Sequence, residues 1–162
     1  MGIDVRISDA ISKGFLDAVA GLSPKDFRPE FNAMGRWMRD ETVATFRAET
    51  DPYGNPWAPL ARSTIAEKTK KGAPAPELIL VETGEMANSF QYRALVNGVR
   101  VFNNRVFDDG TTAEIHQEGG THPVGKNFIP ARPMLPDTGR FPEHWAMEIE
   151  KIIGEGITRV LG

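Results

Sequence analysis

The longest regular pattern in the sequence is a helical one that runs from Ser23 to Glu49. Ser23 is a favourable N-cap, and Pro24 suits the first position of a helix. About 24 helical residues would be roughly 36 Å long, close to the width of a small domain. The pattern predicts a long amphipathic helix, with Pro29 and Gly35 as possible kink points. The side chains expected to face the core are spaced four, three, four, seven and one residues apart: Phe27, Phe31, Met34, Met38, Thr45 and Phe46.

A second amphipathic pattern closes the sequence, from Phe141 to Leu161. Gly154 and Gly156 interrupt it, and each costs about 1 kcal/mol relative to alanine in a helix. The last turns of this helix are therefore expected either to fray or to let another chain approach closely. The apolar positions are spaced four, three, one, four and three residues apart: Trp145, Ile149, Ile152, Ile153, Ile157 and Val160.

The strand signals are short. Gly2–Ile7 alternates apolar and charged residues, as a half-buried edge strand does. Two further strands, Phe90–Val96 and Val99–Phe102, are joined by Asn97-Gly98, a dipeptide that favours a hairpin because both positions tolerate positive φ. Shorter helices are expected over Asp9–Gly21, Ser63–Lys70, Thr83–Phe90 and, as helix or strand, Thr112–Gln117.

Two proline-rich stretches are predicted to be loops. Asp51–Leu60 holds three prolines, which remove backbone donors and favour extended geometry. Trp57 within it either pins the loop onto the core or fills a partner's pocket, and the first reading is favoured. Lys68–Pro76 is expected to be mobile. Its basic run could touch nucleic acid or an acidic partner, but a run this short is more typical of a solvated helix end.

Composition restricts the function classes. Lys and Arg number 19 against 22 Asp and Glu, so the net charge of −3 argues against a chain that mainly neutralises phosphates. Without cysteine there is no disulfide or thiolate metal site. No apolar run reaches the length of a signal peptide or membrane span, so the protein is expected in the cytoplasm or in an assembly built there, with no membrane partner. The 162 residues fit one domain, without internal repeats.

Two histidines near a Gly-Gly pair raise the hypothesis of a zinc site. His116, His122 and Glu118 lie within seven residues, and His144 could join them from the last helix. The six-residue spacing crosses Gly119-Gly120, however, and cannot present both histidines on one helix turn. The sequence also lacks a nucleophile elbow and a phosphate-binding loop. We therefore expect no enzyme, no metal and no cofactor, and keep a zinc-dependent hydrolase and a weak nucleic-acid-binding module as alternatives.

Arg132 stands in a rigid context, between Ala131 and Pro133. A guanidinium makes fixed bidentate pairs with carboxylates. Two readings remain equally open: a buried ion pair that stabilises the loop, or a salt bridge to a neighbouring subunit.

Four motifs follow one another in a recognisable order. They are Asp51-Pro-Tyr-Gly-Asn-Pro-Trp-Ala-Pro-Leu60, Leu80-Val-Glu-Thr-Gly-Glu-Met-Ala-Asn-Ser-Phe90, Ile115-His-Gln-Glu-Gly-Gly120 and Ile129-Pro-Ala-Arg-Pro-Met-Leu135. This succession resembles the phage virion morphogenesis family, the tail-completion proteins of Mu-like phages and prophages. The resemblance covers roughly Leu16 to Ile153.

The resemblance implies an α+β fold, a small antiparallel sheet with a central hairpin, flanked by a long N-terminal amphipathic helix and a C-terminal helix. It implies a structural protein of the virion tail or neck, assembled in the bacterial host cytoplasm, that acts in tail completion or head–tail joining without catalysis. The positions that match the family pattern are interpreted as fold and assembly determinants: Trp57, Thr83, Gly84, His116, Gln117, Gly119, Pro130, Ala131, Arg132 and Pro133.

The sequence departs from the family pattern at two places. Met134-Leu135-Pro136 stands where the family commonly has Phe-Leu-Gly, and Val106–Asp109 where it usually has a Tyr-Ala pair. The implied partners are further copies in a ring, the head–tail connector, and tail-tube or terminator proteins, with weak DNA contact possible at the neck. We expect the segments 68–76 and 103–126 to be mobile and to contact these neighbours.

Overall fold

A computed structural model of the chain describes residues 1–6, 22–23, 27–81, 83–125, 127–137 and 139–162. The helix predicted over Asp9–Gly21 lies outside these ranges. The chain falls into two compact units. Unit 1 comprises Met1, Glu41–Phe90 and Asn103–Leu135, and unit 2 comprises Gly2–Asp40, Gln91–Phe102 and Pro136–Gly162.

The long helix predicted from the sequence is present as α3 (Arg28–Ala48). Phe27, just before it, has a 3₁₀ conformation, and residues 24–26 lie outside the described part of the chain. Its residues up to Asp40 belong to unit 2, and those from Glu41 belong to unit 1. The six side chains expected to face the core are all buried, which confirms the amphipathic pattern.

Unit 2 contains a three-stranded antiparallel sheet of β1 (Gly2–Arg6), β2 (Gln91–Ala94) and β3 (Gly98–Phe102). The strand order is β1-β3-β2, so the hairpin strand β3 is central. Val99 and Val101 of β3 are fully buried, and Arg100 between them is exposed, so the two valines face the core.

The hairpin is confirmed, but its turn lies one residue earlier than predicted. Ala94 pairs with Val99, and the amide of Leu95 donates to the carbonyl of Gly98, so the two turn residues are Val96 and Asn97. Neither Asn97 nor Gly98 has a positive φ. The register of β3 against β1 and β2, with both valines inward, takes precedence over the local preference of Asn-Gly.

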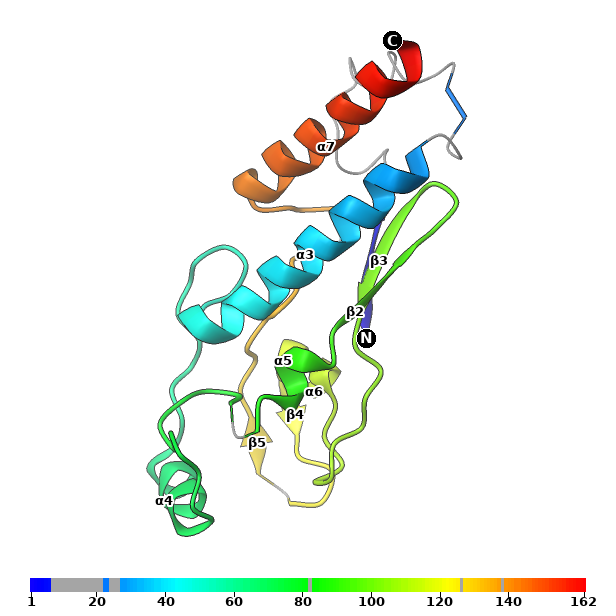
Figure 1. Cartoon of the computed structure of the whole chain (residues 1–162). Helices are drawn as coiled ribbons and strands as arrows, with labels where there is room; N and C mark the ends of the chain where they lie inside the picture. Colours follow the sequence, from blue (N-terminus) through cyan, green and yellow to red (C-terminus); the bar gives the residue numbers. More distant parts are fainter. Residues whose placement is uncertain (7–21, 24–26, 82, 126, 138) are drawn as a thin grey trace. The chain divides into compact units, whose positions relative to one another are not determined.

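In unit 2, α3 is packed between the sheet and the terminal helix α7 (Glu143–Leu161), as Figure 1 shows. A Cβ at Gly35 would come 2.4 Å from Tyr92 Cδ2 on the sheet side. On the other side, the rings of Trp37 and Trp145 lie 5.4 Å apart, edge to face. The small residue Gly35 thus permits close approach to the sheet, a role that its interpretation as a kink point missed.

The close approach expected at Gly156 is made by the same chain. A Cβ there would meet Glu30 Cγ at 2.7 Å and Phe27 Cδ1 at 3.0 Å. Next to this contact, the Arg159 guanidinium donates to both carboxylate oxygens of Glu30 at 3.0 and 2.9 Å. A bidentate charge-assisted pair of this kind holds the end of α7 on the start of α3.

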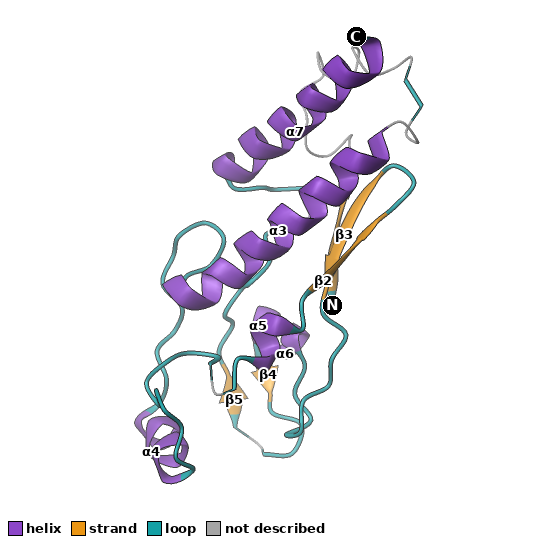
Figure 2. Ribbon diagram, viewed as in Figure 1, coloured by secondary structure: helices purple, strands orange, loops and turns teal. Residues whose placement is uncertain are grey.

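Unit 1 contains the end of α3 and a set of short elements joined by long loops (Figure 2). They are α4 (Arg62–Lys70), α5 (Glu85–Asn88), α6 (Ala113–Glu118), β4 (Gly120–Thr121) and β5 (Phe128–Ile129). β4 pairs antiparallel with β5. The structure confirms the predicted α+β class with a small antiparallel sheet and two long helices. Within the described residues, no helix combines the length and hydropathy that a membrane crossing requires.

Candidate functional site

All four sequence motifs belong to unit 1, and Trp57 of the first motif bonds to the last one. It is buried, and its indole N–H donates to the carbonyl of Pro133 at 2.9 Å. Its ring lies edge to face on Phe46, 5.5 Å between centroids, and Phe46 in turn lies 6.1 Å from Phe90. The reading in which Trp57 pins its loop onto the core is therefore confirmed.

The loop around Trp57 is held by its own polar groups. The Asp51 carboxylate accepts hydrogen bonds from the amides of Tyr53 and Asn55 and from the Asn55 side chain, each at 2.8 Å. The amide of Trp57 donates to the carbonyl of Glu49. These bonds place the indole without help from regular secondary structure.

Gln117 clamps the segment that ends in Met134-Leu135. Its side-chain oxygen accepts from the amides of Met134 and Leu135 at 2.8 and 3.0 Å, and its side-chain nitrogen donates to the carbonyl of Leu135 at 2.8 Å. One primary amide thereby satisfies three backbone groups next to two buried apolar side chains. The motif at 115–120 is fastened in this way to the motif at 129–135.

Arg132 is turned inward, with only 5% of its surface exposed. Its Nε donates to the carbonyl of Ala58 at 2.9 Å and its Nη2 to that of Pro59 at 3.3 Å. Among the described residues no ion pair involves Arg132, so its partners are neutral carbonyls and not a carboxylate of the loop. Burial lowers the pKa of the guanidinium. The side chain joins the motif at 51–60 to the motif at 129–135.

His116 lies beside Arg132 in the same cluster. Its carbonyl accepts from the amide of Arg132 at 2.6 Å. The ring Nδ1 is buried and has no hydrogen-bond partner in the structure. Burial, followed by the positive charge of Arg132, lowers the pKa of His116 to about 4. The imidazole is neutral at physiological pH.

The two glycines that match the family pattern adopt positive φ angles. Gly119 has φ +76°, and a Cβ there would come 2.9 Å from the amide nitrogen of Ala131. At the end of α6 the chain therefore passes directly against the motif at 129–135. Gly84, at φ +75°, precedes α5, where the hydroxyl of Thr83 accepts from the amide of Glu85 at 3.4 Å. Pro130 is half-buried directly after β5.

His122 belongs to a different contact from His116. Its Nδ1 accepts from the amides of Val124 and Gly125 at 3.2 and 3.0 Å, and its Nε2 lies 3.6 Å from a carboxylate oxygen of Asp109. The described part of the chain holds no group of three or more His, Asp or Glu side chains that could bind a metal ion. The structure therefore places the two histidines in separate hydrogen-bonding environments.

Comparison with known proteins gives a match over residues 9–156 to the phage virion morphogenesis family. The chain belongs to the phage virion morphogenesis family. The match covers most of the sequence and includes all four motifs described above. A search of curated proteins and a search of solved structures each found no match. Membership indicates a structural role in virion assembly.

The structure shows how this family member accommodates a methionine at position 134, next to Leu135. Both side chains are buried, and both amides bind Gln117. An apolar residue at 134 is what the site requires, because its side chain fills the core while its amide is held by Gln117.

Sequence reasoning missed several buried polar residues, of which Lys68 and Asn103 lie in unit 1. Lys68, interpreted as part of a solvated basic run, is only 7% exposed, and its Nζ donates to the carbonyls of Leu78 and Val81 at 2.6 and 3.2 Å. Asn103 is buried as well, and its side chain donates to the carbonyl of Met86 and accepts from the amide of Arg105. Neither residue has a local pattern that could have revealed it, because the carbonyls of Leu78, Val81 and Met86 reach these side chains only through tertiary structure.

Proposed function

We propose that this protein acts in tail completion or head–tail joining, as a homo-oligomeric ring without catalytic activity. The observation that carries the proposal is the use of the motif side chains. Trp57, Gln117 and Arg132 all direct their polar groups at the chain's own main chain. Motif residues that bind the main chain in this way support a rigid scaffold.

Exposed apolar side chains on one part of unit 1 support the assembly role. Val106, Val124 and Phe128 are 66%, 82% and 75% exposed; the first two lie in loops and Phe128 lies in β5. Large exposed apolar side chains are candidates for protein interaction sites. We infer that this region contacts a neighbouring copy, the head–tail connector, or a tail-tube or terminator protein.

The proposed place of action is the tail or neck of the virion, reached by assembly in the bacterial host. A phage or induced prophage that lacks this gene should accumulate filled heads and tails that are not joined, or tails of abnormal end structure, in electron micrographs. A plasmid copy of the wild-type gene should restore joined virions. Normal, infectious virions in the absence of the protein would contradict the proposal.

A further inference from the structure

Helix α4 of unit 1 packs very little on its own chain. All nine of its residues are described; Lys68 is buried, Ile65 is half-buried, and the others are exposed. The buried side chain is a lysine that donates to the carbonyls of Leu78 and Val81, so apolar packing is not what holds this helix. Helices this short are marginal in water and normally depend on tertiary packing. α4 therefore presents a surface that its own chain does not cover.

Local signals do not make up for the missing packing of α4. Ala61 at the N-cap makes no side-chain cap bond, and the first turn holds no acidic residue. Lys71 and Glu67 form an ion pair four residues apart, at 3.3 Å, and both side chains are exposed. Such a pair contributes only a few tenths of a kcal/mol. A neighbouring molecule is the remaining source of stability for α4.

The structure leaves only part of the basic run available to such a neighbour. Lys68 is buried and Lys71 is paired. Arg62 and Lys70 are exposed, and in the described part of the chain neither has an ion-pair partner. With Ala66 between them they are spaced four and four residues apart, so they lie along one side of α4. This side is basic and exposed.

Helix α6 of unit 1 has an exposed side of the opposite charge. Glu114 and Glu118 are four residues apart, and both are exposed. Neither has an ion-pair partner among the residues that the structure describes. Like charges at this spacing destabilise a helix. The side chain of Gln117, between them in sequence, binds the segment at 134–135, so the two glutamates are on the outward side.

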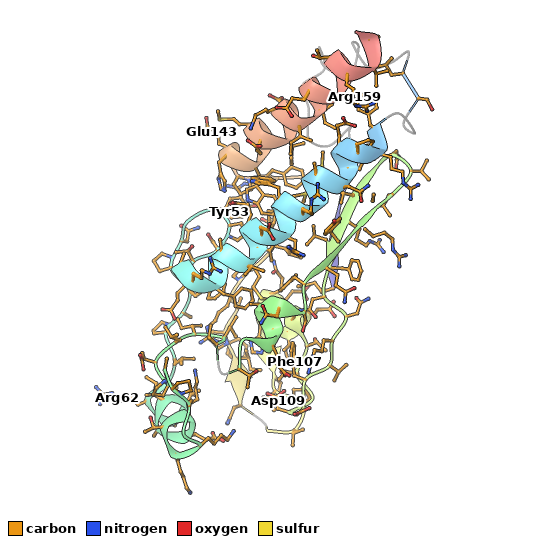
Figure 3. The ribbon with its side chains drawn as sticks, in the orientation of Figure 1. Tyr53, Arg62, Phe107, Asp109, Glu143 and Arg159 are labelled. Atoms are coloured by element: carbon orange, nitrogen blue, oxygen red, sulfur yellow. The ribbon has the colours of Figure 1, made fainter. Side chains whose placement is uncertain are left out.

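α4 and α6 are set apart within unit 1 (Figure 1). Figure 3 shows the side chain of Arg62 extending from α4 away from the loop with Phe107 and Asp109, which precedes α6. The two charged sides are therefore available to meet between two copies. A contact between two different surfaces of the same chain is heterologous, and it produces a ring when the rotation closes.

We propose that α4 of one copy docks on the outward side of α6 in the next copy, with Arg62 and Lys70 against Glu114 and Glu118. The contact covers α4 and relieves the repulsion between the two glutamates. This inference rests on the proposed ring. A nucleic-acid partner fits less well, because two available cations neutralise few phosphates and the whole chain has a net charge of −3.

Charge reversal on the full-length chain tests the contact. The α4-reversed variant carries Arg62→Glu and Lys70→Glu, and the α6-reversed variant carries Glu114→Lys and Glu118→Lys. Each should weaken self-association by about tenfold or more in sedimentation velocity and native mass spectrometry, since attractive charge pairs become repulsive. The chain with all four substitutions should associate like the wild type, and the two reversed variants should associate with each other when mixed.

A matched control separates this contact from an effect of net charge. Arg36→Glu with Arg47→Glu on α3 changes two exposed arginines and shifts the net charge as the α4-reversed variant does, so it should leave association unchanged. Thermal unfolding shows whether each variant is folded. Arg62→Gln with Lys70→Gln is the milder pair if the α4-reversed chain does not fold, and it should also weaken association.

Several results would overturn the inference. They are wild-type association in a folded α4-reversed or neutral variant, a folded four-fold variant that stays monomeric, and a wild-type chain that is monomeric at all concentrations. Duplex DNA binding that falls steeply with salt and is lost in the α4-reversed variant, with association unchanged, would make α4 a nucleic-acid contact instead. The proposed function fails separately, when virions form without the protein.

Discussion

Gln117 makes three hydrogen bonds to the main chain with one side chain, and none can be replaced by water without opening the core next to Met134 and Leu135. Gln117→Ala leaves two amides and one carbonyl without partners. Since a buried group left unpaired costs about 1–3 kcal/mol, we expect a loss of about 3 kcal/mol in the free energy of unfolding, measured by urea denaturation.

The neighbouring exposed residue provides the control for Gln117. Glu118→Ala should change the free energy of unfolding by less than about 0.5 kcal/mol. Gln117→Glu keeps both acceptor bonds and loses the donor bond, so its effect should fall between the two. Equal stability of Gln117→Ala and Glu118→Ala would show that the clamp contributes nothing.

His116 makes stability depend on pH. In the folded chain it stays neutral down to about pH 4, whereas in the unfolded chain it takes up a proton near pH 6.5. Between these values the unfolded state binds more protons, so the free energy of unfolding falls as the pH is lowered from about 6.5 to about 4 and levels off below. At 1.36 kcal/mol per pH unit, the loss reaches about 3 kcal/mol.

The measurement is a series of urea denaturation curves between pH 7 and pH 4. His116→Gln should remove this part of the pH dependence because glutamine does not titrate. His116→Asn, a second substitution that does not titrate, should remove it as well. If both variants show the same slope as the wild type, another group is responsible.

The α3–sheet contact depends on one missing side chain. Gly35→Ala adds a Cβ at 2.4 Å from Tyr92 Cδ2 and 2.8 Å from Val99 Cγ2. Alanine favours a helix by about 1 kcal/mol over glycine, but overpacking a core costs about 1–3 kcal/mol. The Cβ distances are far below ordinary contact distances, so the cost of overpacking exceeds the gain in helix propensity. We expect the free energy of unfolding, measured by thermal or urea denaturation, to fall by about 1–2 kcal/mol.

A double-mutant cycle checks the physical reason. In a Tyr92→Ala background the ring is gone, and Gly35→Ala should cost less than in the wild type. An unchanged cost in that background would place the strain elsewhere, for example in the backbone of α3.

The helices and strands follow from local patterns to different degrees. The apolar spacing of α3 and α7 predicted both helices and the buried side chains within them, because a helix of that length exposes one side consistently. The hairpin was also predicted, but its turn at Val96-Asn97 was not. The register is set by which residues of β3 meet the core, and a dipeptide preference does not contain that information.

Assembly is a property of the whole molecule. The proposal that the exposed apolar side chains of unit 1 contact a neighbouring protein can be tested by substitution. Phe128→Asp places a charge at a position that is 75% exposed, so the free chain should keep its stability within about 0.5 kcal/mol. A buried unpaired charge in an interface is costly. We therefore expect Phe128→Asp to fail to complement a phage that lacks the gene, while Phe128→Leu complements it.

The segments 68–76 and 103–126 are predicted to be mobile in the free chain and to become ordered by neighbours. Hydrogen exchange should show protection of both segments in assembled tails relative to the purified protein. The amide of Ala73 is bonded to the carbonyl of Lys68, and α6 lies inside the second segment, so these amides serve as internal references. Equal exchange in the two states would contradict the prediction.

The sequence by itself determined the long helices, the existence of the hairpin, the loop around Trp57 and, through four ordered motifs, the family. Each of these is encoded in residues that are near one another along the chain. Tertiary structure alone decided that Arg132 binds the carbonyls of Ala58 and Pro59, that Lys68 is buried, and that His116 and His122 act apart. The carbonyls that bind Arg132 and Lys68 belong to other loops, and a backbone carbonyl looks the same at every position of a sequence until folding brings it to a particular side chain.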